Sequence, residues 1–195
     1  MKVAKLEFIP ASIPYKHREV SYQVQRNGVT DVIIKATTDH GLFGWGESCS
    51  GANVESLVEA LKAMAPFVLG RSPWESEAIR RELWHHGVWI FRKPTASFAY
   101  AGIDIALWDV CGKSCGQPLY NLFGGKVRNR ANYFYYLAPG SSEEIAAQCR
   151  EGMERGFQVF YLKVGLDIEA ELEMVRTRPL APRSRSVWTP MGLGP

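Results

Sequence analysis

The stretch Ala101-Gly102-Ile103-Asp104-Ile105-Ala106-Leu107-Trp108-Asp109, with Gly112-Lys113 just after it, decides the fold of this chain. It lies in a helix that we predict from about Thr95 to Lys113, and Gly116 is available to end that helix. The helix is apolar on nearly every side, so we expect it to be buried.

The first fifty residues predict an antiparallel meander. Alternating apolar residues and a β-branched run mark its strands, which we place at 4–8, 21–25, 31–38 and 42–47. Asn27-Gly28 and Asp39-His40-Gly41 are turn signals between strands. The segment Ile13–Val20 is polar and contains Pro14, so we expect an exposed loop that is able to cover a neighbouring element.

Two more helices are predicted between the meander and the apolar helix. Apolar residues recur at helical spacing at Leu57, Leu61, Met64 and Val68. Ser72-Pro73-Trp74-Glu75 has the pattern of a capping box with Pro at the first helical position, which starts the second helix. The meander and the helices together predict an α+β domain with its linker over residues 1–130.

From Ala131 the pattern changes to strand, helix, strand and helix. We predict strands at Asn132–Ala138 and Gln158–Val164, and a helix that starts at the capping box Ser141-Ser142-Glu143-Glu144 and ends near Gly156. Asp167 is expected to cap a second helix. Alternation at this spacing implies parallel βαβ units over residues 131–177.

Composition excludes several classes of protein. The chain has 195 residues, 46% of them hydrophobic and 22% charged, which excludes disorder and coiled coil. No apolar run approaches the roughly 18–20 residues that cross a bilayer, so we expect no membrane contact and a cytoplasmic location. A net charge of +3 is too small to indicate nucleic acid, and four cysteines are too few for a disulfide scaffold.

Lys163 is the first candidate for chemistry, because it lies near the carboxyl end of a predicted parallel strand, where α/β barrels carry their catalytic groups. Tyr161, two residues earlier, points to the same face. Desolvation or a nearby cation lowers the pKa of such a lysine until it can act as a base. The alternative is a lysine that extends from a strand end into water.

Other reactive residues favour structural roles. His85-His86 cannot easily share one metal, because adjacent residues on a helix point about 100° apart. Cys111 and Cys115 are interpreted as small core residues, and Asp104 and Asp109 as groups with structural partners. We therefore predict no metal ligands in this chain.

With these elements in place, the chain resembles the enolase superfamily, in its mandelate racemase and muconate lactonizing branch. Three stretches carry the resemblance: Gly44-Trp45-Gly46-Glu47, the run Ala101–Asp109 with its continuation to Leu122-Phe123-Gly124-Gly125, and Tyr161-Leu162-Lys163-Val164-Gly165. The resemblance extends over about Met1 to Arg176 and excludes the remaining residues.

The resemblance implies a fold and a reaction. The α+β domain, an antiparallel meander with a helical bundle, would be a capping domain, followed by the first two βα units of an incomplete TIM-type (β/α) barrel. Family members remove the proton α to the carboxylate of a small molecule and stabilise the enediolate with Mg²⁺, held by carboxylates on the third, fourth and fifth barrel strands. The intact protein would be a homo-oligomer.

The resemblance also assigns site residues. Lys163 aligns with the second lysine of the family's Lys-x-Lys motif, which acts as acid or base, and Tyr161 stands in place of the first. The missing cation would have helped to depress the pKa of Lys163, so Lys163 could be protonated at neutral pH, or Tyr161 signals a different substrate class. The residues expected to contact substrate are His17, Glu47, Cys49, Ser50, Asn53 and Tyr136.

Residues 178–195 differ in kind from the body of the chain. They have no helical or strand period, and from Arg176 onward there are four arginines, four prolines and no acidic residue. Where the family has Val-Asp-Ala-Asn-Gly-x-Trp, whose Asp is the first metal ligand, this chain ends Val187-Trp188-Thr189-Pro190-Met191-Gly192-Leu193-Gly194-Pro195. We expect an out-of-frame or disordered tail.

Our hypothesis for the mismatch is a frame change near Thr177 or Arg178; the alternative is a natural short protein with a basic, Pro-rich terminus. If the last base of each codon is joined to the first two of the next, Trp188 and Thr189 force GAC, an Asp, and Met191 and Gly192 force GGG, a Gly. The triplets between permit Ala and Asn, so the family motif is a permitted alternate translation. We expect a truncated chain without meaningful turnover; the alternative is a non-catalytic binding or oligomerisation module.

The frame change predicts the nucleotide sequence around codon 178. A shifted frame is expected to run on into a long barrel-like translation with further acidic residues at strand ends. Sequencing of the coding DNA across Arg176–Pro195 checks this, and a stop codon soon after the junction in that frame would count against it.

Overall fold

The computed structural model describes residues 1–20, 25–49, 53–86, 95–164, 169, 172 and 185–190. They form two compact units. The first unit holds Met1–Ile13 and Val29–Val127, and the second holds Pro14–Gly28 and Arg128–Pro195. Pro14–Gly28 therefore belongs with the later part of the chain, whereas the sequence placed it within the first domain.

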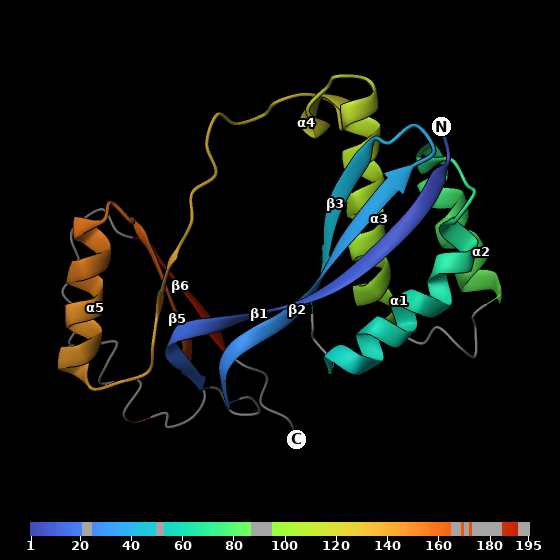
Figure 1. The fold of residues 1–195 in the computed structure, drawn as a ribbon. Coiled ribbons are helices and arrows are strands. Elements are labelled where there is room, and N and C mark those ends of the chain that lie inside the picture. The colour runs from blue at the N-terminus through green and yellow to red at the C-terminus, as the bar shows by residue number, and fades with distance from the viewer. Residues whose placement is uncertain are drawn as a thin grey trace. The chain divides into compact units, whose positions relative to one another are not determined.

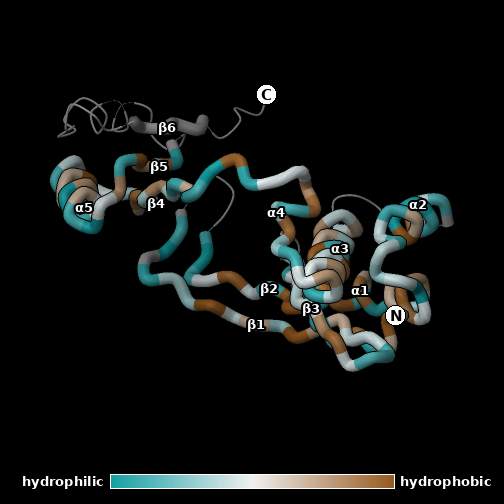
Figure 2. The backbone as a smooth tube through the Cα atoms, turned by 90° about the horizontal axis from the view of Figure 1, so that it is seen from above, coloured by the Kyte–Doolittle hydropathy of each residue, from teal (hydrophilic) through white to brown (hydrophobic). Residues whose placement is uncertain are grey.

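A three-stranded sheet, ordered β1-β2-β3, contains the long strands of the chain (Figure 1). The strands are β1 (Val3–Val20), β2 (Gln25–Thr38) and β3 (Phe43–Ser48). β2 and β3 are antiparallel, with Ile34 opposite Gly46. Figure 2 shows hydrophobic and hydrophilic stretches along β1 and β2. From Val32 to Thr38, buried and half-buried residues alternate one by one in β2, as expected for a strand with one covered face.

The segment Ile13–Val20 is part of β1, so the predicted loop is wrong. Its polar side chains pair across to β2: Arg18 donates to Gln25 over 2.6 Å, and Arg26 donates to Glu19 over 2.5 Å. These side-chain pairs with β2 stabilise the polar end of β1, so this part of the strand forms without an apolar face. Asn27-Gly28 lies inside β2 rather than in a turn, and the predicted strand 21–25 falls mostly outside the described residues.

The helices predicted from the periodicity of the sequence are present in the first unit. α1 (Val54–Val68) buries the four predicted apolar residues Leu57, Leu61, Met64 and Val68. Ser72 caps a short 3-10 helix, η1 (Pro73–Glu75), which leads into α2 (Ser76–His86). α3 (Thr95–Ser114) and the short α4 (Leu119–Leu122) follow. Among the described residues, no helix is long and apolar enough to cross a membrane.

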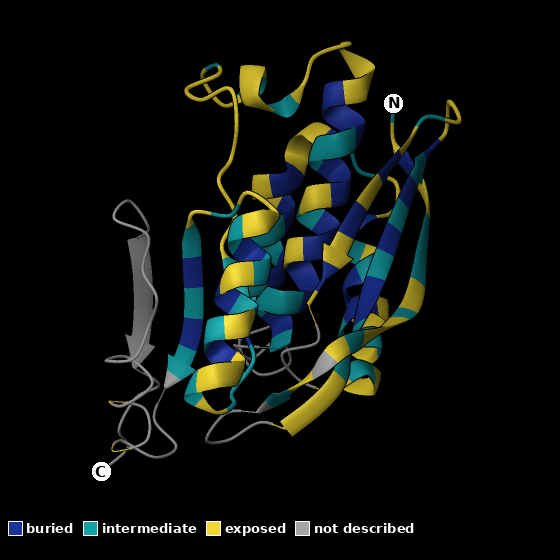
Figure 3. Cartoon of the chain, turned by 90° about the vertical axis from the view of Figure 1, so that its left-hand side faces the viewer, coloured by how far each residue is buried: buried dark blue, intermediate teal, exposed yellow. Residues whose placement is uncertain are grey.

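α3 lies against β3 at very close range, because glycines remove side chains from both surfaces. A Cβ on Gly46 would overlap the carbonyl oxygen of Gly102, and a Cβ on Gly44 would overlap that of Ala106. Ten residues of α3 are buried, as the sequence predicted, although Ala101 and Ile105 are exposed. Figure 3 shows the resulting dark band of buried positions in the strands and helices of this unit.

Asp109 fixes the position of α3 on the edge strand. Its Oδ2 accepts a hydrogen bond from the backbone N–H of Trp45 over 2.8 Å and from Lys113 Nζ over 2.6 Å. Lys113 also donates to the carbonyl of Phe43 over 3.1 Å. The predicted structural role of Asp109 is therefore confirmed.

The second unit contains a parallel sheet ordered β4-β5-β6. β4 (Tyr135–Leu137) and β5 (Val159–Val164) are parallel, as predicted, and α5 (Ser142–Glu154) connects them. The capping box of Ser141 and Glu144 at the start of α5 is also confirmed. The core of this unit consists of Leu137, Ile145, Cys149, Phe160 and Leu162. The helix predicted after Asp167 lies mostly outside the described residues, of which Glu169 and Leu172 are helical.

β6 (Arg185–Pro190) corrects part of the prediction for residues 178–195. The sequence predicted no regular structure there, but these six residues pair in parallel with β5. Val187, Trp188 and Thr189 are residue types that favour strands, and the backbone groups of β5 offer them a ladder. The out-of-frame origin of the segment stays a prediction.

The close approach of α3 and β3 predicts a large cost for one added methyl group. Gly46→Ala is expected to lower the free energy of unfolding by about 1–3 kcal/mol or more, because backbone must move to make room. Urea denaturation followed by tryptophan fluorescence measures the loss. Gly140→Ala is the comparison variant, since its Cβ would meet the side chain of Glu144 rather than backbone, and it should cost no more than the capping hydrogen bond of Glu144 to Ser141. Equal stability of the two variants would contradict the packing argument.

Candidate functional site

Lys163 and Tyr161 lie on the same face of β5, as their spacing predicted. The alternate residues, Phe160 and Leu162, are buried in the core of the second unit, so Tyr161 and Lys163 face the other side. The ring of Tyr161 packs against that of Tyr136 on β4, with centroids 5.8 Å apart. Lys163 Nζ lies 5.9 Å from the centroid of Tyr136. Three predicted site residues are thus brought together.

Glu19, on β1, forms an ion pair with Lys163. The contact joins Oε1 of Glu19 to Lys163 Nζ, while Oε2 of Glu19 accepts a hydrogen bond from Arg26 Nε over 2.5 Å. Side-chain exposure is 11% for Glu19 and 23% for Lys163, so water screens this pair less than it screens a surface pair. One carboxylate therefore binds two cations.

The pair shifts both acid–base equilibria toward the charged forms. The hydrogen bond to Glu19 raises the pKa of Lys163 above its ordinary value, against the opposing effect of burial. Burial works to raise the pKa of Glu19, but the hydrogen bonds from Lys163 and Arg26 outweigh it and lower that pKa. Lys163 is accordingly an ammonium group at neutral pH.

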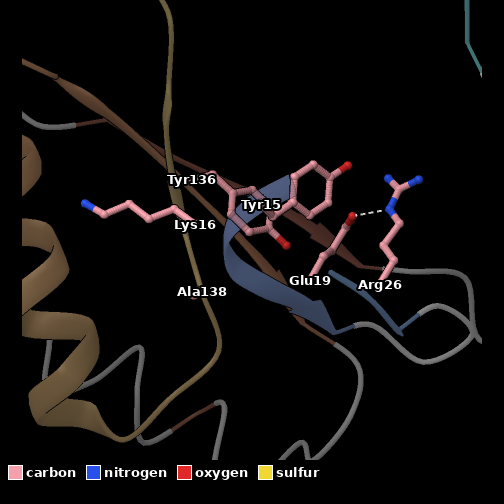
Figure 4. A pocket seen from close by; sticks show the side chains of 6 residues that line it. All are labelled: Tyr15, Lys16, Glu19, Arg26, Tyr136 and Ala138. Carbon is pink, nitrogen blue, oxygen red and sulfur yellow. Dashed lines mark hydrogen bonds and ion pairs between the residues drawn. The ribbon is translucent and has the colours of Figure 1, made fainter. Parts of the chain in front are cut away.

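A pocket of about 410 Å³ lies beside this pair, within the second unit. Its described lining residues are Tyr15, Lys16, Glu19, Arg26, Tyr136 and Ala138. Figure 4 shows the rings of Tyr15 and Tyr136 between the Lys16 side chain on one side and the Glu19–Arg26 pair on the other. Lys16 lies 3.9 Å from Glu151, a distance typical of a weak, solvent-screened ion pair.

The hydroxyl of Tyr136 has no hydrogen-bond partner among the described residues, although it is buried. Burial raises its pKa, so it is a neutral donor. Buried polar groups are rarely left unpaired in proteins. A hydroxyl of this kind on a pocket wall is available to a ligand or to a water molecule.

The remaining predicted substrate residues belong to other places in the chain. Glu47 is exposed on β3, and Cys49 is an exposed free cysteine. Asn53 caps α1, where its side chain accepts a hydrogen bond from Ser56 N over 2.9 Å. The side chain of His17 and the whole of Ser50 lie outside the described part of the structure. Contact of these five residues with substrate stays a prediction.

Sequence reasoning missed Glu19, Arg26, Tyr15 and Lys16 as site residues. Glu19, Tyr15 and Lys16 lie in the segment Ile13–Val20, which the sequence predicted to be an exposed loop covering a neighbouring element. The signal that could have found Glu19 is its charge, because a half-buried lysine on a strand requires a counter-ion. A separation of 144 residues hides that pairing from local patterns.

The described residues do not offer a metal site, since no three His, Cys, Asp or Glu groups among them lie close enough to hold an ion. The family's Mg²⁺ therefore does not fit the donor groups described here.

Comparison with known proteins gives a consistent family. Residues 14–124 match the family described as the N-terminal domain of mandelate racemase / muconate lactonizing enzyme. The N-succinyl-L-Arg/Lys racemase of Bacillus cereus is 28% identical over 187 residues, which are 91% of this chain and 49% of that relative. The D-galactonate dehydratase of Pectobacterium atrosepticum is 32% identical over 132 residues, 67% of this chain and 34% of the relative.

Solved structures share the fold. The Bacillus cereus racemase superposes with a TM-score of 0.84 at 27% identity, over 96% of this chain and 52% of that one. A protein from Roseovarius nubinhibens, complexed with magnesium, has a TM-score of 0.84 at 22% identity, over 95% and 52% of the two chains. The chain spans about half the length, or less, of the relatives it matches.

The unpaired hydroxyl of Tyr136 predicts a small effect of its removal. Tyr136→Phe is expected to leave the free energy of unfolding unchanged or slightly higher, because it deletes a buried donor that has no partner. Tyr100→Phe is the matched comparison and should lose about 1 kcal/mol, since the Tyr100 hydroxyl donates to the carbonyl of Ser76. Urea denaturation followed by circular dichroism measures both. A loss at Tyr136 equal to that at Tyr100 would show that the Tyr136 hydroxyl has a partner.

Proposed function

Because the chain belongs to the mandelate racemase / muconate lactonizing enzyme family, we propose that it is the capping domain and the start of the (β/α) barrel of an enzyme that removes the proton α to a carboxylate. The family match over residues 14–124 carries this proposal. Relatives and structural neighbours include racemases, galactonate dehydratases, an epimerase and a cycloisomerase.

The pocket beside Lys163 is proposed to take the small-molecule carboxylate. Lys16 and Arg26 on its wall are cations, and Lys163 lies next to it through its contacts with Glu19 and Tyr136. Cations attract a carboxylate, and the Tyr136 hydroxyl can donate a hydrogen bond to it. In the intact enzyme Lys163 would then give or take the proton, with Tyr161 two residues earlier on the same face of β5.

This chain by itself is proposed to have no meaningful turnover. Stabilisation of the developing enediolate charge is usually the largest single contribution to such a reaction. In the family Mg²⁺ supplies it, and the described residues do not offer ligands for that ion. The chain would therefore bind a carboxylate without exchanging its α proton. A homo-oligomer is proposed for the intact protein.

The proposal predicts binding without chemistry. Saturation-transfer NMR on the full chain with N-succinyl-L-lysine and with galactonate is expected to show contact with at least one of them, and no deuterium is expected to enter the α position in D₂O. Lys16→Met should weaken the contact, because it removes a cation from the pocket wall, whereas Lys62→Met should not, since Lys62 is an exposed partner of Glu59 on α1.

Two outcomes would contradict the proposal. Equal saturation-transfer signals from the Lys16→Met and Lys62→Met variants would show that the pocket is not the carboxylate-binding site. Deuterium uptake that requires Mg²⁺, together with stoichiometric Mg²⁺ binding by calorimetry, would overturn the inactivity of the chain.

A further inference from the structure

We propose that Glu19 is a positioning residue that holds Lys163 as an ammonium group and fastens the 14–20 segment of β1 onto β5. In this state Lys163 donates a proton and does not accept one. The ion pair between Glu19 and Lys163 is observed in the structure. Only the use of Lys163 as a proton donor in catalysis rests on the proposed function.

Both oxygens of Glu19 are used, each by a different cation. Lys163 contacts Oε1, and Arg26 contacts Oε2 from the neighbouring strand β2. Because Arg26 holds the second oxygen, the carboxylate is oriented toward Lys163 rather than free to rotate into water. Glu19 is only 11% exposed, so a change of partner would require the segment that carries it to shift.

Among the residues whose side chains the structure describes, the charged and titratable groups around Lys163 are Glu19 from β1, Tyr136 from β4 and Tyr161 from β5, with Arg26 of β2 beyond Glu19. Burial raises the pKa of Tyr136, so its phenol is neutral. Among these described groups Glu19 is the carboxylate, against the two positive charges of Lys163 and Arg26.

Departure of Glu19 would weaken the preference of Lys163 for the ammonium form. Burial and the nearby Arg26 would then both disfavour that form and lower the pKa of Lys163. The fraction of neutral amine, which can accept a proton from substrate carbon, would rise. The position of one carboxylate thus biases the same side chain toward its acid or its base form.

The proposal is tested by the pKa of Lys163 in the full chain. It can be measured from the pH dependence of amine acetylation, quantified by mass spectrometry on the peptide that contains Lys163. In Glu19→Gln the pKa of Lys163 is expected to fall below its value in the parent chain and below the roughly 10.4 of a free lysine. In Glu151→Gln, which removes a carboxylate that pairs with Lys16 and Arg155, it should stay unchanged.

Two readouts separate this effect from loss of the fold. Unfolding would bring the pKa of Lys163 to the value of a free lysine and not below it. Hydrogen exchange of residues 14–20 should become faster in Glu19→Gln but not in Glu151→Gln. Equal pKa values of Lys163 in these two carboxamide variants would overturn the proposal. None of these readouts uses a substrate, so failure of ligand binding alone would contradict only the proposed function.

Discussion

The contact between α3 and β3 is the constraint on which the first unit depends. Gly44 and Gly46 on the strand and Gly102 on the helix allow backbone to meet backbone, so the two elements pack without intervening side chains. Asp109 then fixes the helix lengthwise through the N–H of Trp45. A buried helix can slide along an apolar face, but a charge-assisted hydrogen bond to one backbone donor has a single register. The other helices of the first unit then pack against α3, whose position on β3 is already fixed.

The second unit is organised by charge as well as by packing. Its small core, which includes Phe160 and Leu162, covers one face of β5. The other face carries Tyr161 and Lys163, and the half-buried ammonium group of Lys163 is stabilised by a counter-ion. Glu19 supplies this counter-ion from a strand that begins in the first unit and ends in the second. The chemistry of the pocket and the placement of β1 therefore rely on the same carboxylate.

The sequence predicted those helices and strands that are determined by interactions between residues close together in the chain. The four buried residues of α1, the capping box at Ser141 and the shared face of Tyr161 and Lys163 follow from periodicity and short-range hydrogen bonds. The full length of β1 was missed because its polar end is stabilised by partners on β2. Asn27-Gly28 was misjudged for a related reason, since strand pairing overrides a turn preference. The partner of Lys163 lies 144 residues away, which no local pattern reveals.

β1 and β2 each belong partly to the first unit and partly to the second. This division limits which segments two related genes could exchange by recombination without breaking up a unit. A crossover near Val127 looks natural from the order of the chain, yet it would supply Glu19 and Arg26 from one parent and Lys163 from the other. If the second parent lacked an amine at that position, the carboxylate would be left half-buried with one cation. The segments that would have to be inherited together are Pro14–Gly28 and the residues from Arg128 onward, which form one unit although they are separated in the sequence. Positions 19 and 163 are therefore expected to change together over evolution.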